Sequence, residues 1–346
     1  MKSWQTFLKK SGIAALAAAL ALSFAACTSG GPASSEPSAA GQTSSAAASP
    51  VTVKNAAGND VTIKEAPQKI VVLPVWAAEI TLDLVDTARV AGLSSYMDSS
   101  VTTALSDKAS KVGKRVSSEA EAVLGLTPDL VVLDTFNDAD GALAKTLTDA
   151  GVTVLTLASP VTFTEIADRI ATLSKALFAA DEGAELVSAM QARLDAVANK
   201  VKDIPEADRV KVMYYEASYS ADGMLCAYGE GSPFQAIAEA AGTVNVCTAP
   251  LYSNVSKETV VNDWKPQVLV VPGVTYGADF SVSEDGGAAM KAAILGDSTL
   301  KTVPAVEEGR IVALTEKYRG STSHYMAYAV EELAEVCYPD RFPTNS

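Results

Sequence analysis

The 346-residue sequence lacks most of the residue patterns that mark an enzyme. It has a single histidine, His324, and its four cysteines form no Cys-x-x-Cys pair, which argues against a zinc knuckle. It contains no Gly-x-Ser-x-Gly turn, no His-Glu-x-x-His helix, no Walker lysine motif and no Gly-x-Gly-x-x-Gly turn after a strand. A Ser-His-Asp triad would have to use His324 without a nucleophile turn beside it. We therefore expect neither catalysis nor a cofactor.

Positive charge is also scarce. The chain has 27 Lys and Arg against 41 Asp and Glu, a net charge of −14. Phosphate backbones and anionic lipid surfaces repel a chain of this charge. We expect no nucleic-acid partner and no adsorption to anionic lipid.

The N-terminus holds an apolar stretch that is too short for a membrane span. The apolar stretch is residues 13–24. A basic segment precedes it, and small residues lead from it to Cys27. A span needs about 20 apolar residues, so residues 1–26 are predicted to be a cleaved export signal. Phe24-Ala-Ala-Cys27 resembles the lipobox of bacterial lipoproteins, in which the cysteine is acylated. An ordinary secretory signal with an incidental cysteine is the alternative.

Composition divides the rest of the chain. Residues 27–50 are almost entirely Ser, Ala, Gly, Thr and Pro, which indicates a flexible linker. The remaining roughly 300 residues exceed one ordinary domain. We predict an N-terminal lobe at 51–160, bridging helices at 161–205 and a C-terminal lobe at 206–346.

The bridging segment carries a helical repeat of apolar residues. They recur in steps of three and four at Phe163, Ile166, Ile170, Leu173 and Leu177, and again at Leu186, Met190, Leu194, Val197 and Val201. This spacing predicts helices with one apolar stripe. We expect a break at Asp181–Gly183, followed by a long helix of about 20 residues, roughly 30 Å.

Strands and helices alternate on both sides of this segment, after a hairpin at residues 51–63. The expected strands are 69–73, 90–93, 130–133, 152–157, 210–215, 268–271 and 310–314. The expected helices are 77–85, 142–150, 234–241 and 324–338. Alternation of this kind predicts an α/β fold with mostly parallel sheets. We expect two Rossmann-like lobes, one long backbone helix between them and a ligand cleft between the lobes.

One pattern occurs once in each predicted lobe. Glu121 and Glu258 each begin a short helical turn, a proline follows seven or eight residues later, and a buried-type strand comes next. The lobes therefore read as variants of one unit.

Six fragments in the same order resemble a known family. They are 55–63, 66–73, 89–94, 126–132, 231–234 together with 241–245, and Tyr338-Pro-Asp-Arg-Phe342. Together they are similar to the iron-siderophore/vitamin B12 periplasmic-binding proteins, which are helical-backbone solute receptors of ABC importers. The resemblance covers residues 51–342. It implies a monomeric, extracytoplasmic lipoprotein, anchored to the cell membrane by lipid, that delivers a metal chelate to an ABC permease dimer with its ATPase. It also implies that Glu121 and Glu258 dock into permease arginines, and Glu119 could substitute for Glu121. The alternative is that Glu121 and Glu258 are ordinary solvated acids beside the favourable end of a helix dipole.

Ligands of α/β sheets bind beyond the carboxyl ends of the strands. The loops there supply aromatic faces, one cation and one acid as candidate ligand contacts: Trp76, Tyr96, Asp98, Phe136, Tyr219, Tyr276, Tyr318 and Arg319. Some of them could instead cap the sheet or face solvent. The loop 94–98 is similar to that of cobalamin receptors, which favours a corrinoid slightly over a ferric siderophore or haem.

Several alternatives stay open from the sequence. His324 could ligate a haem iron or cobalt, although a local hydrogen bond at a helix start is the commoner role. Cys226 and Cys247 could form a disulfide or stay as buried thiols. A chelatase-like enzyme and a surface scavenger without a permease are the competing functions.

Overall fold

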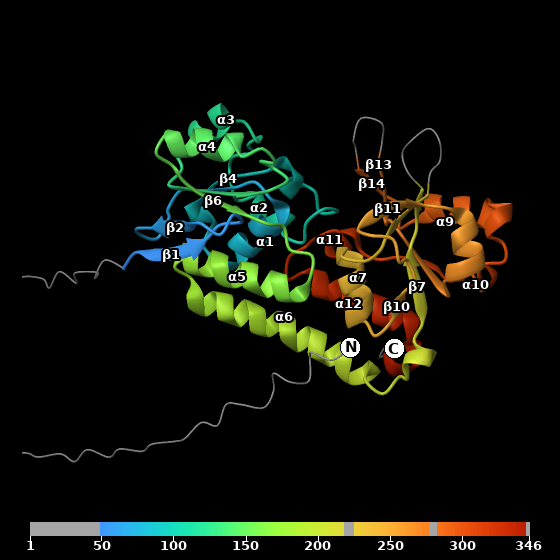
Figure 1. The fold of residues 1–346 in the computed structure, drawn as a ribbon. Helices are drawn as coiled ribbons and strands as arrows, with labels where there is room; N and C mark the ends of the chain where they lie inside the picture. The colour runs from blue at the N-terminus through green and yellow to red at the C-terminus, as the bar shows by residue number, and fades with distance from the viewer. Residues whose placement is uncertain (1–48, 218–224, 277–281, 344–346) are drawn as a thin grey trace, which may run out of the picture. The chain divides into compact units, whose positions relative to one another are not determined.

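The structure is a computed structural model that describes residues 49–217, 225–276 and 282–343 (Figure 1). The predicted signal segment, Cys27 and Tyr219 lie outside the described residues. Residues from Ala47 onward form one compact unit. Among the described residues, no helix is both long and apolar enough to cross a bilayer.

The N-terminal sheet is parallel and buried on both faces. Its strand order is β4-β3-β5-β6, formed by β3 (Ile70–Val72), β4 (Val90–Leu93), β5 (Leu130–Asp134) and β6 (Thr153–Leu157). Alternate residues of β3 point to opposite sides, so that Ile70 and Val72 join one hydrophobic core and Val71 joins another. The predicted strands of this lobe are confirmed.

Helices cover both faces of this sheet (Figure 1). They are α1 (Val75–Leu84), α2 (Ser106–Ala109), α3 (Ala120–Leu124) and α4 (Ala142–Asp149), with short 3-10 turns at Thr87–Arg89 and Ser95–Asp98. The predicted hairpin is β1 (Val51–Lys54) with β2 (Asp60–Ile63).

The C-terminal sheet repeats the parallel arrangement with order β10-β7-β12-β15. Its strands are β7 (Lys211–Tyr214), β10 (Val244–Asn245), β12 (Val268–Val271) and β15 (Ile311–Ala313). This lobe also has two small antiparallel sheets. One contains β8 (Glu216–Ala217), β9 (Leu225–Tyr228) and β11 (Tyr252–Val255), and the other pairs β13 (Val274–Tyr276) with β14 (Val282–Glu284). The helices are α7 (Pro233–Ala240), α8 (Lys257–Thr259), a π-helical turn Val260–Trp264, α9 (Ala288–Gly296), a 3-10 turn Ser298–Leu300, α10 (Pro304–Glu307), α11 (Glu316–Arg319) and α12 (Met326–Cys337), with 3-10 turns at Glu206–Asp208 and Pro339–Arg341. The α/β fold with two parallel sheets is confirmed.

The bridging segment forms two helices, α5 (Phe163–Leu177) and α6 (Ala180–Val201). The predicted break at Asp181–Gly183 is wrong: the chain turns at Phe178, whose backbone is left-handed with φ 58°. Asp181 instead lies in the first turn of α6, where a negative charge is favourable beside the helix dipole.

Gly183 is needed for close packing of α5 and α6. A Cβ atom at this position would collide with Cβ and Oγ of Ser174 on α5. The sequence suggested that Gly183 breaks a helix, whereas in the structure its lack of a Cβ atom allows α5 and α6 to pack closely.

One hydrophobic core joins the two halves. It contains buried residues of both sheets together with α5, α6 and α12, including Ile170, Leu194 and Val330. Helix α6 therefore packs against elements of both lobes and not only against its neighbour α5.

Candidate functional site

Three aromatic residues follow three neighbouring strands of the N-terminal sheet. Trp76 follows β3, Tyr96 follows β4 and Phe136 follows β5. Because these strands are parallel and adjacent, their carboxyl ends share one edge of the sheet. The structure therefore brings these three predicted contacts to the same edge.

Trp76 is largely buried at this edge. Its side chain is 5% exposed, and Nε1 donates a hydrogen bond to Oδ2 of Asp134 at 3.1 Å. Asp134 also accepts hydrogen bonds from Ser159 Oγ at 2.8 Å and from the backbone N–H groups of Phe136 and Asn137 at 3.1 and 2.8 Å. Asp134 thus fixes the indole and the start of the loop. No role for Asp134 was predicted from the sequence.

Tyr96 and Phe136 extend into solvent. They are 68% and 85% exposed, which is unusual for rings of this size and leaves their faces free to stack on a planar ligand. Asp98 pairs with Arg115, with 2.6 Å between Oδ1 and Nη2. This pair holds the 94–98 loop against the segment that follows α2.

The opposite lobe contributes α11, which follows the edge strand β15. The Tyr318 ring stacks on Tyr328 with 4.8 Å between centroids and 20° between planes. Arg319, with a side chain 12% exposed, pairs with Glu316 through Nε at 3.1 Å and through Nη2, and its Cζ lies 4.8 Å from the centre of the Tyr214 ring. Burial lowers the pKa of Arg319, but Tyr214 and the Glu316 carboxylate more than offset this and raise it above its ordinary value. The guanidinium is thus already engaged by an acid of its own helix.

Tyr219 and Tyr276 are the two predicted contacts whose side chains are not described. Tyr219 lies outside the described residues, and Tyr276 is the last residue of β13, described only in its backbone. The ligand-contact assignments of all eight residues stay predictions.

A cavity of about 330 Å³ lies beside the loop that carries Phe136. Its lining includes Asn137, Asp138 and the start of α4, and the Asp138 carboxylate accepts hydrogen bonds from the N–H groups of Leu143 and Ala144, both at 2.9 Å. Asp138 therefore caps the helix, and its carboxylate is already used by the backbone.

The single histidine makes a hydrogen bond to an acid of the other lobe. His324 is buried, and its Nε2 lies 3.1 Å from Oδ2 of Asp83 on α1. Asp83 also accepts hydrogen bonds from Lys108 Nζ and Tyr325 Oη, each at 2.9 Å. Burial raises the pKa of Asp83, but the bonds from His324 and Lys108 outweigh it and leave the pKa below its ordinary value.

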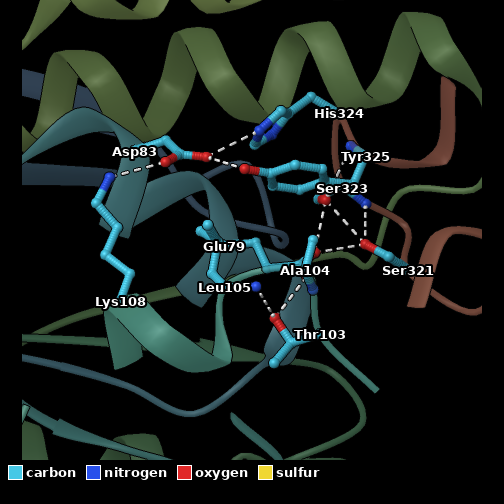
Figure 2. Close-up of polar contacts among 10 residues, drawn as sticks. All are labelled: Glu79, Asp83, Thr103, Ala104, Leu105, Lys108, Ser321, Ser323, His324 and Tyr325. Carbon is cyan, nitrogen blue, oxygen red and sulfur yellow. Dashed lines mark hydrogen bonds and ion pairs between the residues drawn. The ribbon is translucent and has the colours of Figure 1, made fainter. Parts of the chain in front are cut away.

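Glu79, one turn before Asp83, is the buried acid that the sequence analysis missed. Its carboxylate contacts Thr103, Ala104, Ser321 and Ser323 (Figure 2). An acid within the apolar sequence Val75–Leu84 is a visible signal, but its partners lie far away in the chain.

Glu121 and Glu258 occupy matching places in the two lobes. Each lies in the first turn of a short helix, α3 or α8, and each is exposed. Within the described part of the chain, neither carboxylate has a hydrogen bond or an ion pair.

The backbone after these helices also matches. Thr127 before Pro128 and Lys265 before Pro266 both adopt left-handed conformations, with φ 49° and 44°. Non-glycine residues seldom adopt this conformation. Each proline then leads into a central strand, β5 or β12. The repeated unit predicted from sequence is therefore present down to an uncommon backbone angle.

Cys226, Cys247 and Cys337 are buried free thiols. Within the described ranges, no group of three or more His, Cys, Asp and Glu side chains could hold a metal ion.

Known proteins share both the sequence and the fold. The model of the periplasmic binding protein family matches residues 70–318. A protein of Bacillus subtilis named uncharacterized ABC transporter substrate-binding lipoprotein YvrC is 29% identical over 336 residues, covering 96% of this chain and 99% of the relative. A cobalamin-binding protein of Halobacterium salinarum is 27% identical over 274 residues, covering 78% of this chain and 69% of the relative.

Solved structures agree on the fold. A periplasmic binding protein from Veillonella parvula superimposes with a TM-score of 0.71 and 20% identity, covering 84% of this chain and 99% of that one. The match of the family model to most of the chain confirms the family resemblance expected from the sequence. This chain belongs to the periplasmic binding protein family.

Proposed function

We propose that this protein is the solute-binding lipoprotein of an ABC importer and that it delivers a metal chelate to the membrane permease. Binding is reversible, and the protein performs no chemistry on the ligand. Cys27 carries the lipid anchor outside the cytoplasm, and the protein acts as a monomer. The lobe boundaries are those predicted from the sequence, 51–160 and 206–346 around the bridging helices 161–205.

The observation that carries this proposal is the matched pair of exposed acids. Glu121 and Glu258 begin equivalent helices of two similar lobes, and no described side chain neutralises either one. Two like charges at fixed positions suit a permease dimer that presents two cationic sites. Such charges set orientation and association rate more than affinity.

The aromatic edge supports a large planar ligand. Tyr96 and Phe136 present exposed rings on one lobe, at the edge of the sheet where the carboxyl ends of its parallel strands lie and where ligands of α/β sheets bind. Stacking on such rings suits a tetrapyrrole or an aromatic chelator. Together with the Halobacterium relative, this favours a corrinoid; haem and ferric siderophores belong to the same chemical class of metal chelates.

Uptake and binding measured on the same variants test the docking role. In cells lacking the native gene, the Glu121→Ala/Glu258→Ala variant should abolish uptake of labelled cyanocobalamin while the purified variant keeps its affinity. The control is Asp181→Ala/Glu182→Ala, which removes two exposed acids from the first turn of α6 and should leave uptake unchanged. Normal uptake by the Glu121/Glu258 variant would refute the docking assignment.

A further inference from the structure

Glu79 is a completely buried acid that connects distant parts of the chain. Its Oε1 accepts hydrogen bonds from Thr103 Oγ1 at 2.7 Å and from Ala104 N–H at 3.0 Å. Its Oε2 accepts from Ser321 Oγ at 2.5 Å and Ser323 Oγ at 2.6 Å. Four donors thus meet a group that, when ionised, only accepts.

The serine hydroxyls are oriented by the backbone around them. Ser321 Oγ accepts the Ser323 N–H at 3.1 Å, and Ser323 Oγ accepts the Tyr325 N–H at 3.2 Å. The two serine oxygens also lie 2.8 Å apart, so the hydroxyl groups and Glu79 Oε2 form one hydrogen-bonded cluster. A buried carboxylate satisfied this completely fixes the geometry of its partners, since any displacement leaves a buried polar group unpaired.

Asp83 makes a second contact with the same segment. It lies four residues after Glu79, on the same face of α1, and accepts hydrogen bonds from the next residues, His324 and Tyr325 (Figure 2). The segment 321–325 is therefore bound to α1 at two successive helical turns.

An aromatic series leads from this segment to a predicted ligand contact. The Tyr325 ring lies 6.0 Å from Tyr328 at 24°, and Tyr328 stacks on Tyr318. Arg193 of α6 covers the Tyr328 ring with Cζ 3.7 Å from its centre and pairs with Glu331. Tyr318 is thus coupled both to α1 and to the backbone helix.

We propose that Glu79 and Asp83 form an inter-lobe pivot that positions Tyr318 and Arg319 of α11 relative to Trp76, without either carboxylate contacting the ligand. Trp76 lies one turn before Glu79 on α1, and α11 ends two residues before Ser321. The two ligand-facing segments are therefore each joined to the pivot over a few residues. This inference rests on the proposed binding function, which it extends by naming the residues that preorganise the site.

A pivot and a direct contact have different kinetic consequences. Loosening a pivot lowers the fraction of molecules in the binding-competent arrangement, and the apparent affinity falls by that fraction. The association rate then falls and the dissociation rate is unchanged. Loss of a direct ligand contact instead raises the dissociation rate.

The experiment combines a measurement without ligand and one with ligand. Fluorophores attached through unnatural amino acids at Lys145 of α4 and Lys291 of α9 report the inter-lobe distance distribution by single-molecule energy transfer in the full mature chain. The variants are Glu79→Gln/Asp83→Asn and, from the other side of the contact, Ser321→Ala/Ser323→Ala. Thr322→Ala is the matched control, because Thr322 lies between the two serines and makes no hydrogen bond in the described structure.

Both pivot variants should broaden the distance distribution of the ligand-free protein, and the control should keep the narrow one. Stopped-flow binding of cyanocobalamin and haemin should then show an association rate reduced by the fraction of molecules that left the narrow population. If the acidic variant does not fold, the serine variant supplies the same test, since it removes only two hydroxyl groups.

The outcomes separate this inference from the proposed function. Unchanged distance distributions in folded pivot variants would overturn the pivot whether or not a ligand binds. A raised dissociation rate with an unchanged association rate would also overturn it, because that result assigns Glu79 or Asp83 to the ligand. If the wild-type protein binds neither probe, that choice of ligands fails, and the distance measurement alone decides the pivot.

Discussion

The close contact between α5 and α6 predicts that the effect of Gly183→Ala on stability changes sign with the residue at position 174. In Gly183→Ala the new Cβ would lie about 1 Å inside the usual ~3.5 Å carbon contact with Ser174. Ser174 cannot turn away, because the colliding atoms include its own Cβ. The helices must separate along a stripe that forms part of the core shared by both lobes.

Two effects of known size oppose each other. Overpacking costs about 1–3 kcal/mol, whereas alanine is favoured over glycine in a helix by about 1 kcal/mol. In the wild-type background the clash should dominate, and Gly183→Ala should lower the free energy of unfolding by up to about 2 kcal/mol. In a Ser174→Gly background the clash is absent, and the same substitution should stabilise by about 1 kcal/mol.

Urea unfolding of the four proteins in this double-mutant cycle measures the coupling directly. A reversal of sign between the two backgrounds is the expected result. If Gly183→Ala stabilises the wild-type protein, or if the two substitutions are additive, the helices do not pack as tightly here as the structure has them.

Three further predictions concern charge, capping and thiols. The lowered pKa of Asp83 contributes stability that is complete above its unfolded-state pKa, about 3.9, and is lost as pH falls through the lower folded-state value. The free energy of unfolding, measured with urea, should therefore fall more between pH 5 and 3 in the wild type than in Asp83→Asn. Thr162→Ala removes the side-chain cap of α5 and should lower the midpoint of urea unfolding by an amount equivalent to about 1 kcal/mol, with an unchanged slope. Burial raises the pKa of Cys337 to about 12 and also raises that of Cys247, so neither thiol should react with a thiol reagent in the folded protein. After denaturation, protein that lacks the signal and linker should show three reactive thiols. A count of one would mean that Cys226 is disulfide-bonded to Cys247.

Local signals predicted most elements of the fold. Helix α7 begins at Pro233 after Ser232, a preferred N-cap residue followed by a preferred first helical residue, and Ser232 Oγ accepts a hydrogen bond from the Gln235 N–H at 3.2 Å. The apolar repeat predicted α5 and α6, and continuous apolar runs predicted the central strands. In each case the decisive interaction lies within a few residues of the signal.

The errors and omissions have a different origin. The role of Gly183 depends on Ser174 across a helix interface, which the helical pattern of either segment alone does not contain. Glu79 sits in an apolar helix, and its partners come from residues 103–104 and 321–323. Contacts between distant segments decide both.

The most direct test of the central claim is a titration of the purified protein with cyanocobalamin, haemin, and catecholate and hydroxamate ferric siderophores, followed by ligand absorbance and tryptophan fluorescence. The proposed function predicts saturable one-to-one binding of one member of this panel, with no conversion of the ligand. Turnover of a metallated tetrapyrrole, or no binding by any member of the panel, would contradict the claim that this protein is a receptor for one of these metal chelates.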